Sequence, residues 1–272
     1  MAAARIASGH SARMAPRIVR KDSRSRIPPW ALDDPLLVSA GPSWARYLDS
    51  VCPRMPEIDL RNDVYRRPLL TALERLGLGN GWLCADVGAG GGDVTVALAA
   101  LVGHHGRVYA IDIDPARRDE VARAAAEAGE AQVVAITQAA EELVLPEPVD
   151  LAYCRFLLLH VVDPLVVLRR MASITRPGGW LLAQEPVTSA GRVAGAATSM
   201  PGARHPDVGA LLPALIREAG LELVDAWAEA QAGAGPGPVA EYLEDLTGVS
   251  PGEDPVVLPP LVTVVARKPA AG

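Results

Sequence analysis

The chain has 272 residues, of which 50% are hydrophobic and 21% charged, and its formal net charge is −6. This apolar content can bury a substantial core, so the composition excludes a wholly disordered protein. The negative charge argues against a general nucleic-acid binder, which would carry a broad basic surface.

Charge is divided unevenly along the chain. Residues 1–30 hold seven basic side chains and one acid, which leaves a net charge of −12 on the remainder because the whole chain is at −6. Apolar residues show no regular helical or strand spacing before Pro28-Pro29, so we predict a disordered basic tail over residues 1–30. A cap segment with short helices is expected over residues 31–80, and the main domain over residues 81–272.

The three cysteines, Cys52, Cys84 and Cys154, form no CxxC pair. The sequence therefore predicts neither a disulfide framework nor a metal site, and Cys84 and Cys154 lie in apolar runs typical of buried strands. No apolar stretch reaches the ~18 residues that span a bilayer, and the first residues lack the apolar core of a secretory signal. We expect a cytoplasmic protein with no membrane partner.

From Val64 onward, helical and extended patterns alternate. Apolar runs that end at Gly or Pro predict strands at 82–87, 107–113, 131–136, 149–154, 180–185, 221–228 and 261–267. Helical spacing predicts helices at 64–76, 93–102, 115–128, 163–175 and 206–219, with a short helix around Tyr242. This alternation is typical of an α/β fold with a doubly wound, mostly parallel sheet. Residues 187–204 are expected to form a flexible loop and residues 232–238 a hinge.

Acidic residues precede three of the predicted helices. Asp114 and Asp163 are each followed by Pro, which favours capping of the helix that begins there. Asp207 is the expected cap of the helix over residues 206–219.

The most informative segment is Asp86-Val87-Gly88-Ala89-Gly90-Gly91-Gly92-Asp93, which joins a predicted strand to a predicted helix. A dinucleotide would place its pyrophosphate at the helix N-terminus, where Asp93 would repel it. No G-x-x-x-x-G-K-[ST] motif is present, so a P-loop is excluded. S-adenosylmethionine (SAM) suits these acids better, because it carries an ammonium and a sulfonium and no phosphate.

A second acid follows the next strand. Asp112 ends the strand at 107–113, where an adenosine ribose would lie in such a sheet, and a carboxylate can accept both ribose hydroxyls.

Taken in order, these motifs resemble the class I SAM-dependent methyltransferases of small-molecule, actinobacterial-like type. Four pieces carry the resemblance: Asp86-x-Gly88-x-Gly90-x-Gly92, Asp112, the strand Val149–Tyr153, and Arg176-Pro177-Gly178-Gly179. The resemblance implies a Rossmann-like seven-stranded sheet whose last strand is antiparallel, and SAM as the cofactor. It implies that the methionine end of SAM contacts Asp86, Gly88, Ala89, Gly90 and Gly92, and that Asp112 and Ile113 lie at the ribose.

By the same resemblance, Ala140 and Glu141 line the adenine, and Cys154 and Arg155 flank the methionine moiety. Many members have an Asp after the third strand that accepts the adenine amino hydrogen, whereas this chain has Ala139 there. Glu141 or the backbone are the two substitutes we consider.

Methyl transfer needs a general base only when the acceptor is protonated. The residues proposed for catalysis are His160 and Glu185, with His205 and Asp207 as further candidates. His160 either acts as a base or orients the turn before Asp163, and Glu185 either faces the crevice or caps a backbone group.

The expected function is a SAM-dependent methyltransferase acting on a small molecule, with secondary metabolism as its setting. The alternative is a SAM-binding protein of the same fold that does not methylate, such as a cyclase, an isomerase or a sensor. A nicotinamide oxidoreductase is opposed by Asp93. The loops after the fifth and sixth strands look short for a lid, so we expect an open site, or one closed by a homodimer partner or by Trp30, Trp44 and Tyr47.

Overall fold

The computed structural model describes residues 60–198 and 202–270, with side chains from Val64 onward. The predicted basic tail, most of the predicted cap segment, and Trp30, Trp44 and Tyr47 lie outside the described residues.

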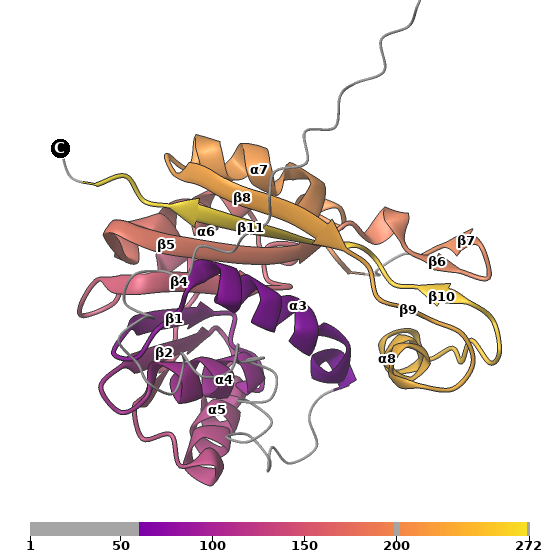
Figure 1. Ribbon diagram of the computed structural model, residues 1–272, viewed down its shortest axis with the longest axis horizontal. Coiled ribbons are helices and arrows are strands. Elements are labelled where there is room, and N and C mark those ends of the chain that lie inside the picture. The colour runs from indigo at the N-terminus through magenta and orange to yellow at the C-terminus, as the bar shows by residue number, and fades with distance from the viewer. Residues whose placement is uncertain (1–59, 199–201, 271–272) are drawn as a thin grey trace, which may run out of the picture. The chain divides into compact units, whose positions relative to one another are not determined.

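The described residues form a seven-stranded sheet with the order β3-β2-β1-β4-β5-β11-β8 (Figure 1). Its strands are β1 (Leu83–Val87), β2 (Arg107–Asp112), β3 (Val133–Thr137), β4 (Val149–Arg155), β5 (Thr175–Pro186), β8 (Glu222–Glu229) and β11 (Leu261–Arg267). The first five strands in this order, β3, β2, β1, β4 and β5, pair in parallel. Strand β11 runs antiparallel to both β5 and β8. The predicted mostly parallel sheet with an antiparallel last strand is confirmed.

Helices cover both faces of this sheet (Figure 1). The elements concerned are α3 (Leu60–Leu76), α4 (Asp93–Val102), α5 (Pro115–Ala128), α6 (Pro164–Ile174) and α7 (Val208–Glu218). Helices α3, α4 and α5 contribute to the cores on one face, and α6 and α7 to the core on the other. None of the described helices is long and apolar enough to cross a membrane.

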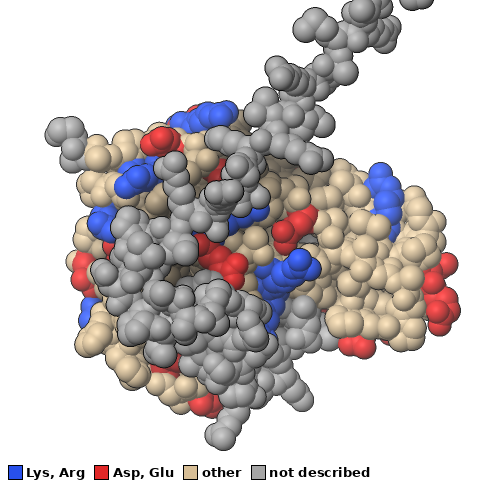
Figure 2. All heavy atoms as spheres, viewed as in Figure 1, with Lys and Arg blue, Asp and Glu red and all other residues tan. Residues whose placement is uncertain are grey.

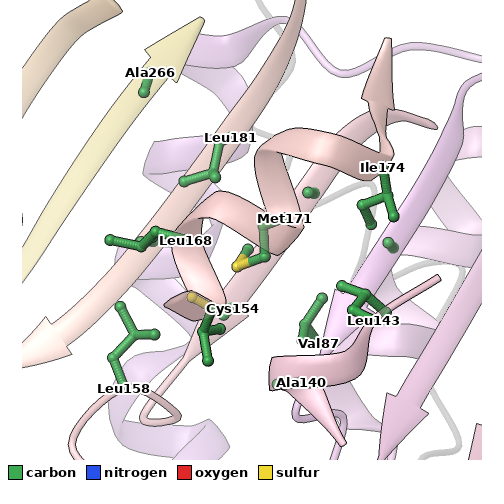
Figure 3. Close-up of a cluster of buried hydrophobic side chains, with 14 of the residues drawn as sticks. Val87, Ala140, Leu143, Cys154, Leu158, Leu168, Met171, Ile174, Leu181 and Ala266 are labelled. Carbon is green, nitrogen blue, oxygen red and sulfur yellow. The ribbon is translucent and has the colours of Figure 1, made fainter. Parts of the chain in front are cut away.

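The strands supply both cores because alternate side chains point to opposite faces. In β4, Leu151 and Tyr153 pack with α3 and α4, whereas Ala152 and Cys154 pack with α6 and α7. Figure 3 shows part of the second core, where the side chain of Met171 from α6 lies near Cys154. Both cores consist mainly of Ala, Val and Leu.

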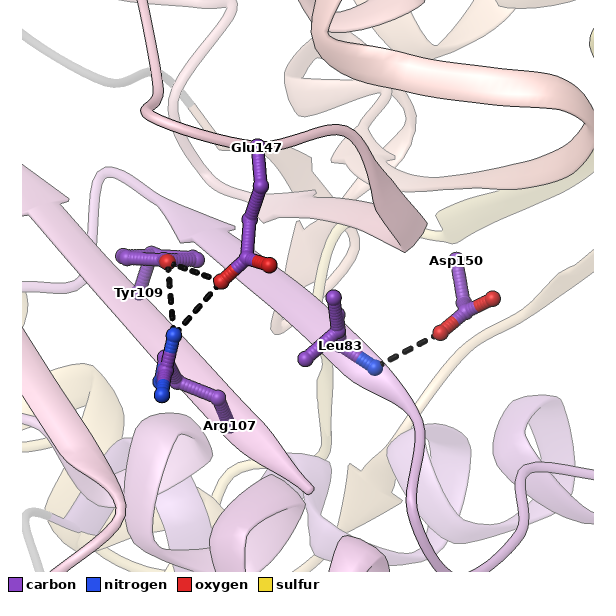
Figure 4. Close-up of polar contacts among 5 residues, drawn as sticks. All are labelled: Leu83, Arg107, Tyr109, Glu147 and Asp150. Carbon is purple, nitrogen blue, oxygen red and sulfur yellow. Dashed lines mark hydrogen bonds and ion pairs between the residues drawn. The ribbon is translucent and has the colours of Figure 1, made fainter. Parts of the chain in front are cut away.

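The amino ends of the strands are joined by polar contacts (Figure 4). Glu147, just before β4, pairs with Arg107 (Nη1–Oε1 2.6 Å) and accepts a hydrogen bond from the Tyr109 hydroxyl at 2.6 Å. Asp150 accepts a hydrogen bond from the Leu83 amide at 2.7 Å. Ligands of open parallel sheets bind at the opposite edge, outside the carboxyl ends of the strands.

Two segments differ from their predictions because each contains a short strand that pairs with β10. The expected loop contains η3 (Thr188–Ala190), β6 (Arg192–Val193) and β7 (Ala196–Ala197), and the expected hinge contains β9 (Ala232–Gly233). With β10 (Val256–Val257) these strands form a second sheet, β7-β6-β10-β9, beside α8 (Pro238–Thr247) (Figure 1). We call this second sheet the cap sheet and, together with α8, the cap; it is a different part of the chain from the cap segment predicted over residues 31–80. The loop prediction was wrong here because composition does not reveal pairings between distant segments.

Smaller differences occur at element ends. Helix α3 begins at Leu60 and continues through Pro68, and β5 begins at Thr175, five residues before the strand predicted at 180–185. Asp114 and Asp163 cap their helices as predicted. Asp207 does not cap α7 through its side chain, and its Oδ1 instead accepts a hydrogen bond from the Ser189 amide at 2.8 Å.

Candidate functional site

The glycine-rich turn at residues 88–92 joins β1 to α4 at the carboxyl edge of the sheet. Gly88 and Gly92 have φ values of 79° and 90°, a region that side chains disfavour. A Cβ on Gly92 would lie 3.1 Å from the Cα of Val121 in α5, and one on Gly88 would lie 3.0 Å from Leu157 Cδ1. Glycine therefore permits both the turn and the close approach of its neighbours.

Asp112, at the end of β2, fastens this turn. Its Oδ2 accepts a hydrogen bond from the Gly90 amide and its Oδ1 one from the Asp114 amide, both at 3.0 Å. A carboxylate offers about four acceptor positions, so hydroxyl donors can still bind there.

A cavity of about 270 Å³ opens beside Asp112. Its walls come from the ends of β1 and β2, the segment after β3 and the segment after β4. The lining residues are Val87, Gly88, Ile111, Asp112, Ile113, Gln138, Ala140, Glu141, Leu157, His160, Val161, Val162 and Arg204. The structure thus brings together six of the residues predicted for the site: Gly88, Asp112, Ile113, Ala140, Glu141 and His160.

Apolar and polar groups divide the walls of this cavity. Ile113 and Val162 are 69% and 70% exposed, so large apolar side chains meet solvent in its lining. Glu141 Oε1 accepts a hydrogen bond from the Val162 amide at 3.3 Å, and Gln138 Oε1 accepts one from the Val144 amide at 3.1 Å. Such a cavity suits a ligand with a flat apolar part and a few polar edges.

Asp86 lies behind the glycine turn rather than in the cavity wall. It is 2% exposed, and its Oδ2 accepts a hydrogen bond from Thr95 Oγ1 at 2.7 Å. Burial raises the pKa of Asp86 to about 7; the hydrogen bond from Thr95 opposes that shift, and the nearby Asp93 adds to it.

Arg155 and Asp93 connect the end of β4 to the first turn of α4. Arg155 Nη2 lies 2.9 Å from Asp93 Oδ2, and the arginine side chain is only 5% exposed. This ion pair lies outside the lining of the cavity, as do Ala89, Gly90 and Gly92. Cys154 is fully buried among apolar side chains of the core (Figure 3).

Glu185, at the end of β5, is fully buried and does not line the cavity. Its Oε1 accepts hydrogen bonds from the amides of Leu157 at 2.9 Å and Leu158 at 2.8 Å. Burial raises the pKa of Glu185 to about 8, although these amides act in the opposite direction. Of the two sequence interpretations, the structure shows the backbone-capping one.

The remaining candidate bases, His205 and Asp207, lie just before α7. His205 Nε2 is 3.2 Å from the Val162 carbonyl oxygen, and Asp207 binds the Ser189 amide. No group of three or more His, Cys, Asp or Glu side chains in the described part of the chain is arranged to hold a metal ion.

Sequence reasoning missed several cavity residues. Leu157, Val161 and Val162 lie directly after the predicted fourth strand, so their position at a strand end was a usable signal. Arg204 reaches the cavity because the amides of Arg204 and His205 bond to the Leu159 carbonyl, a contact between distant segments that no local pattern announces.

Comparisons with known proteins give consistent matches. A family model described as "Methyltransferase domain" matches residues 85–183. A ubiquinone biosynthesis O-methyltransferase of Xanthomonas euvesicatoria pv. vesicatoria is 33% identical over 193 residues, 66% of this chain and 77% of that protein. One from Xanthomonas campestris pv. campestris is 39% identical over 98 residues, 35% of this chain, so the chain spans 39% of that relative's length.

Solved structures share the fold at low identity. A putative methyltransferase from Bacillus halodurans has a TM-score of 0.59 at 17% identity, covering 75% of this chain and 100% of that one. A SAM-dependent methyltransferase from Aquifex aeolicus has a TM-score of 0.55 at 17% identity, with 80% and 97% covered. The [4+2]-cyclase SpnF has a TM-score of 0.59 at 22% identity, with 84% and 93% covered.

Proposed function

We propose that this chain, which belongs to the class I SAM-dependent methyltransferases, transfers a methyl group from SAM to a small-molecule acceptor. Small hydroxylated acceptors are the first class to assay, because the relatives are named O-methyltransferases of ubiquinone biosynthesis. Secondary metabolism as the setting, a homodimer as the assembly and the cytoplasm as the location are further proposals.

The observation that carries this proposal is the cavity beside Asp112. Its volume of about 270 Å³ is just below the usual range of small-molecule sites, about 300–1,000 Å³, so we assign to it only the nucleoside part of the cofactor. Asp112 would accept hydrogen bonds from the ribose hydroxyls and Ile113 would lie against the nucleoside. Ala140 and Glu141 would border the adenine, with Glu141 replacing the acid absent at Ala139.

The methionine end would extend over the glycine turn outside this cavity. Gly88, Ala89, Gly90 and Gly92 allow close backbone approach there. The buried acid Asp86 and the ion pair between Arg155 and Asp93 place charged groups of both signs nearby. Charged groups of both signs suit the ammonium and carboxylate of an amino acid moiety, and the acids oppose a pyrophosphate.

When bound, SAM supplies an activated methyl group, so the protein contributes mainly by positioning the acceptor. His160 is the candidate base among the residues that line the cavity, since Glu185 is enclosed in the core. A base is required only for acceptors that are protonated at the working pH.

Calorimetry with SAM, S-adenosylhomocysteine (SAH) and NAD tests the cofactor. We expect SAM and SAH to bind and NAD not to bind. Absence of SAM binding at high micromolar concentration would contradict the proposal. Incubation with SAM and a panel of hydroxylated acceptors, followed by mass spectrometry for SAH and methylated product, then tests methyl transfer. Binding without transfer across the panel favours the alternative, a SAM-binding protein that does not methylate.

A further inference from the structure

The segment between β4 and α6, residues 156–162, forms one wall of the cavity, and we call it the cavity loop. Leu157, His160, Val161 and Val162 line the cavity, whereas Leu158 and Leu159 are fully buried beneath. The shape of the cavity therefore depends on where this loop is held.

The loop turns sharply as it leaves β4. Phe156 has a φ of 53°, which is disfavoured for a bulky aromatic residue and persists only where neighbours hold it. Its amide donates to the Gln184 carbonyl at 3.1 Å, and its ring meets that of Tyr65 edge-on with centroids 5.0 Å apart.

Glu185 holds the next two residues. Its Oε1 accepts hydrogen bonds from the amides of both Leu157 and Leu158, and the Glu185 side chain is fully buried. Removal of this oxygen would leave the buried Leu158 amide and the part-buried Leu157 amide without their acceptor, which favours movement of the loop.

Movement of the loop would alter the cavity directly. Leu157 faces the glycine turn so closely that a Cβ on Gly88 would lie 3.0 Å from its Cδ1. Leu157 therefore has little room to move toward the turn, and a shift the other way would enlarge the cavity that Leu157 and Asp112 both line.

We propose that Glu185 is a positioning residue for the cofactor cavity: its carboxyl group fixes the backbone of Leu157 and Leu158 from beneath and does not touch the ligand. This inference rests on the proposed function, because it concerns binding of the same cofactor.

Because the Glu185 carboxyl group is expected to be neutral, Gln is a conservative substitute for it. Its Oε2 is buried and has no hydrogen-bond partner among the described residues. A neutral carboxyl group tolerates such a position better than a carboxylate, in agreement with a pKa raised to about 8 by burial. Glu185→Gln keeps the acceptor oxygen and the neutral charge, so it should preserve the loop.

The adjacent residue offers a matched control. The side chain of Gln184 is also fully buried but belongs to a different network, in which it accepts from the Tyr153 hydroxyl at 2.8 Å and donates to Thr263 Oγ1 at 3.0 Å, while its backbone carbonyl keeps the bond from Phe156. Gln184→Leu removes these bonds and leaves the cavity loop contacts of Glu185 in place.

The experiment compares wild type, Glu185→Leu, Glu185→Gln and Gln184→Leu. Calorimetry gives the Kd for SAH, thermal unfolding gives Tm, and hydrogen exchange reports the amides of the cavity loop. We expect Glu185→Leu to weaken SAH binding about tenfold or more and to speed exchange in the loop. We expect Glu185→Gln to stay within about threefold of wild type in Kd, and Gln184→Leu to lower Tm with Kd unchanged.

The outcomes separate the two proposals. If wild type does not bind SAH, the proposed function fails. If wild type binds and Glu185→Leu binds equally well, or if Glu185→Gln is as impaired as Glu185→Leu, the positioning role is overturned. Should Glu185→Leu fail to fold, Glu185→Asp, whose shorter side chain draws the acceptor away from the amides, takes its place with the same expected loss.

Discussion

Asp112 shows how one side chain can organise a site and also serve it. Its two oxygens accept hydrogen bonds from the amides of Gly90 and Asp114, so it shapes the glycine turn while it lines the cavity. The loss of such a residue should reduce ligand binding through both roles.

We therefore predict that Asp112→Ala weakens SAH binding by about 1–3 kcal/mol, measured by calorimetry. Asp119→Ala serves as the control, because Asp119 is exposed on α5, where its carboxylate pairs with Arg118, and it does not line the cavity. Equal affinity of Asp112→Ala and wild type would remove the ribose assignment.

Two buried acids, Asp86 and Glu185, predict the pH dependence of stability. Burial raises their pKa values from 3.8 to about 7 and from 4.5 to about 8. Between the unfolded and folded pKa values the native state binds more protons, so the free energy of unfolding falls as pH rises.

The stability that these two groups contribute should be greatest below about pH 4 and be lost as pH rises to about 8, so we expect urea unfolding to show the free energy of unfolding falling by a few kcal/mol between pH 5 and pH 8. In Glu185→Gln this loss should be smaller, because one titrating group is gone. A free energy of unfolding that rises between pH 5 and pH 8, with no difference between wild type and Glu185→Gln, would contradict the raised pKa values of these carboxyl groups.

At the scale of elements, the turn between β1 and α4 depends on glycines that are not equivalent. Gly92 combines a φ of 90° with a neighbouring backbone atom 3.1 Å from the position of a Cβ, whereas a Cβ on Gly91 would meet nothing within 4 Å. The same substitution should therefore have different effects at adjacent positions.

We predict that Gly92→Ala lowers the free energy of unfolding by more than about 1 kcal/mol, because it adds left-handed strain and forces α4 away from α5. Gly91→Ala should change it by less than about 0.5 kcal/mol. Thermal unfolding of both variants checks this, and equal effects would contradict the assigned packing of Gly92 on Val121.

At the scale of the whole molecule, the central strands carry both cores. Leu151 in β4 is fully buried between flanking strands and helices, whereas Leu211 in α7 is 57% exposed.

On the face shown in Figure 2, the described Lys and Arg side chains are scattered among acidic ones and form no continuous basic surface.

We predict that Leu151→Ala lowers the free energy of unfolding by about 2–5 kcal/mol through loss of apolar contacts and the cavity left behind. Leu211→Ala should cost less than about 0.5 kcal/mol. Urea unfolding of the two variants provides the measurement, and similar losses would place Leu151 outside the core.

The sequence alone determined the seven strands of the main sheet, the caps at Asp114 and Asp163, and the glycine turn with Asp112 beside it. These features depend on short-range rules: apolar periodicity, helix capping and the conformational freedom of glycine. The acids of the turn also indicated a cofactor without phosphate, because a carboxylate at the helix N-terminus repels a phosphate placed beside it.

Only the tertiary structure decided the rest. The cap sheet joins residues 192–193 to 256–257, and Arg204 reaches the cavity through Leu159. Glu185 left two interpretations open in the sequence, and the fold placed it beneath the cavity loop rather than in the cavity. Such contacts join segments far apart in the chain, and the free energy of their packing depends on the assembled sheet rather than on any local pattern.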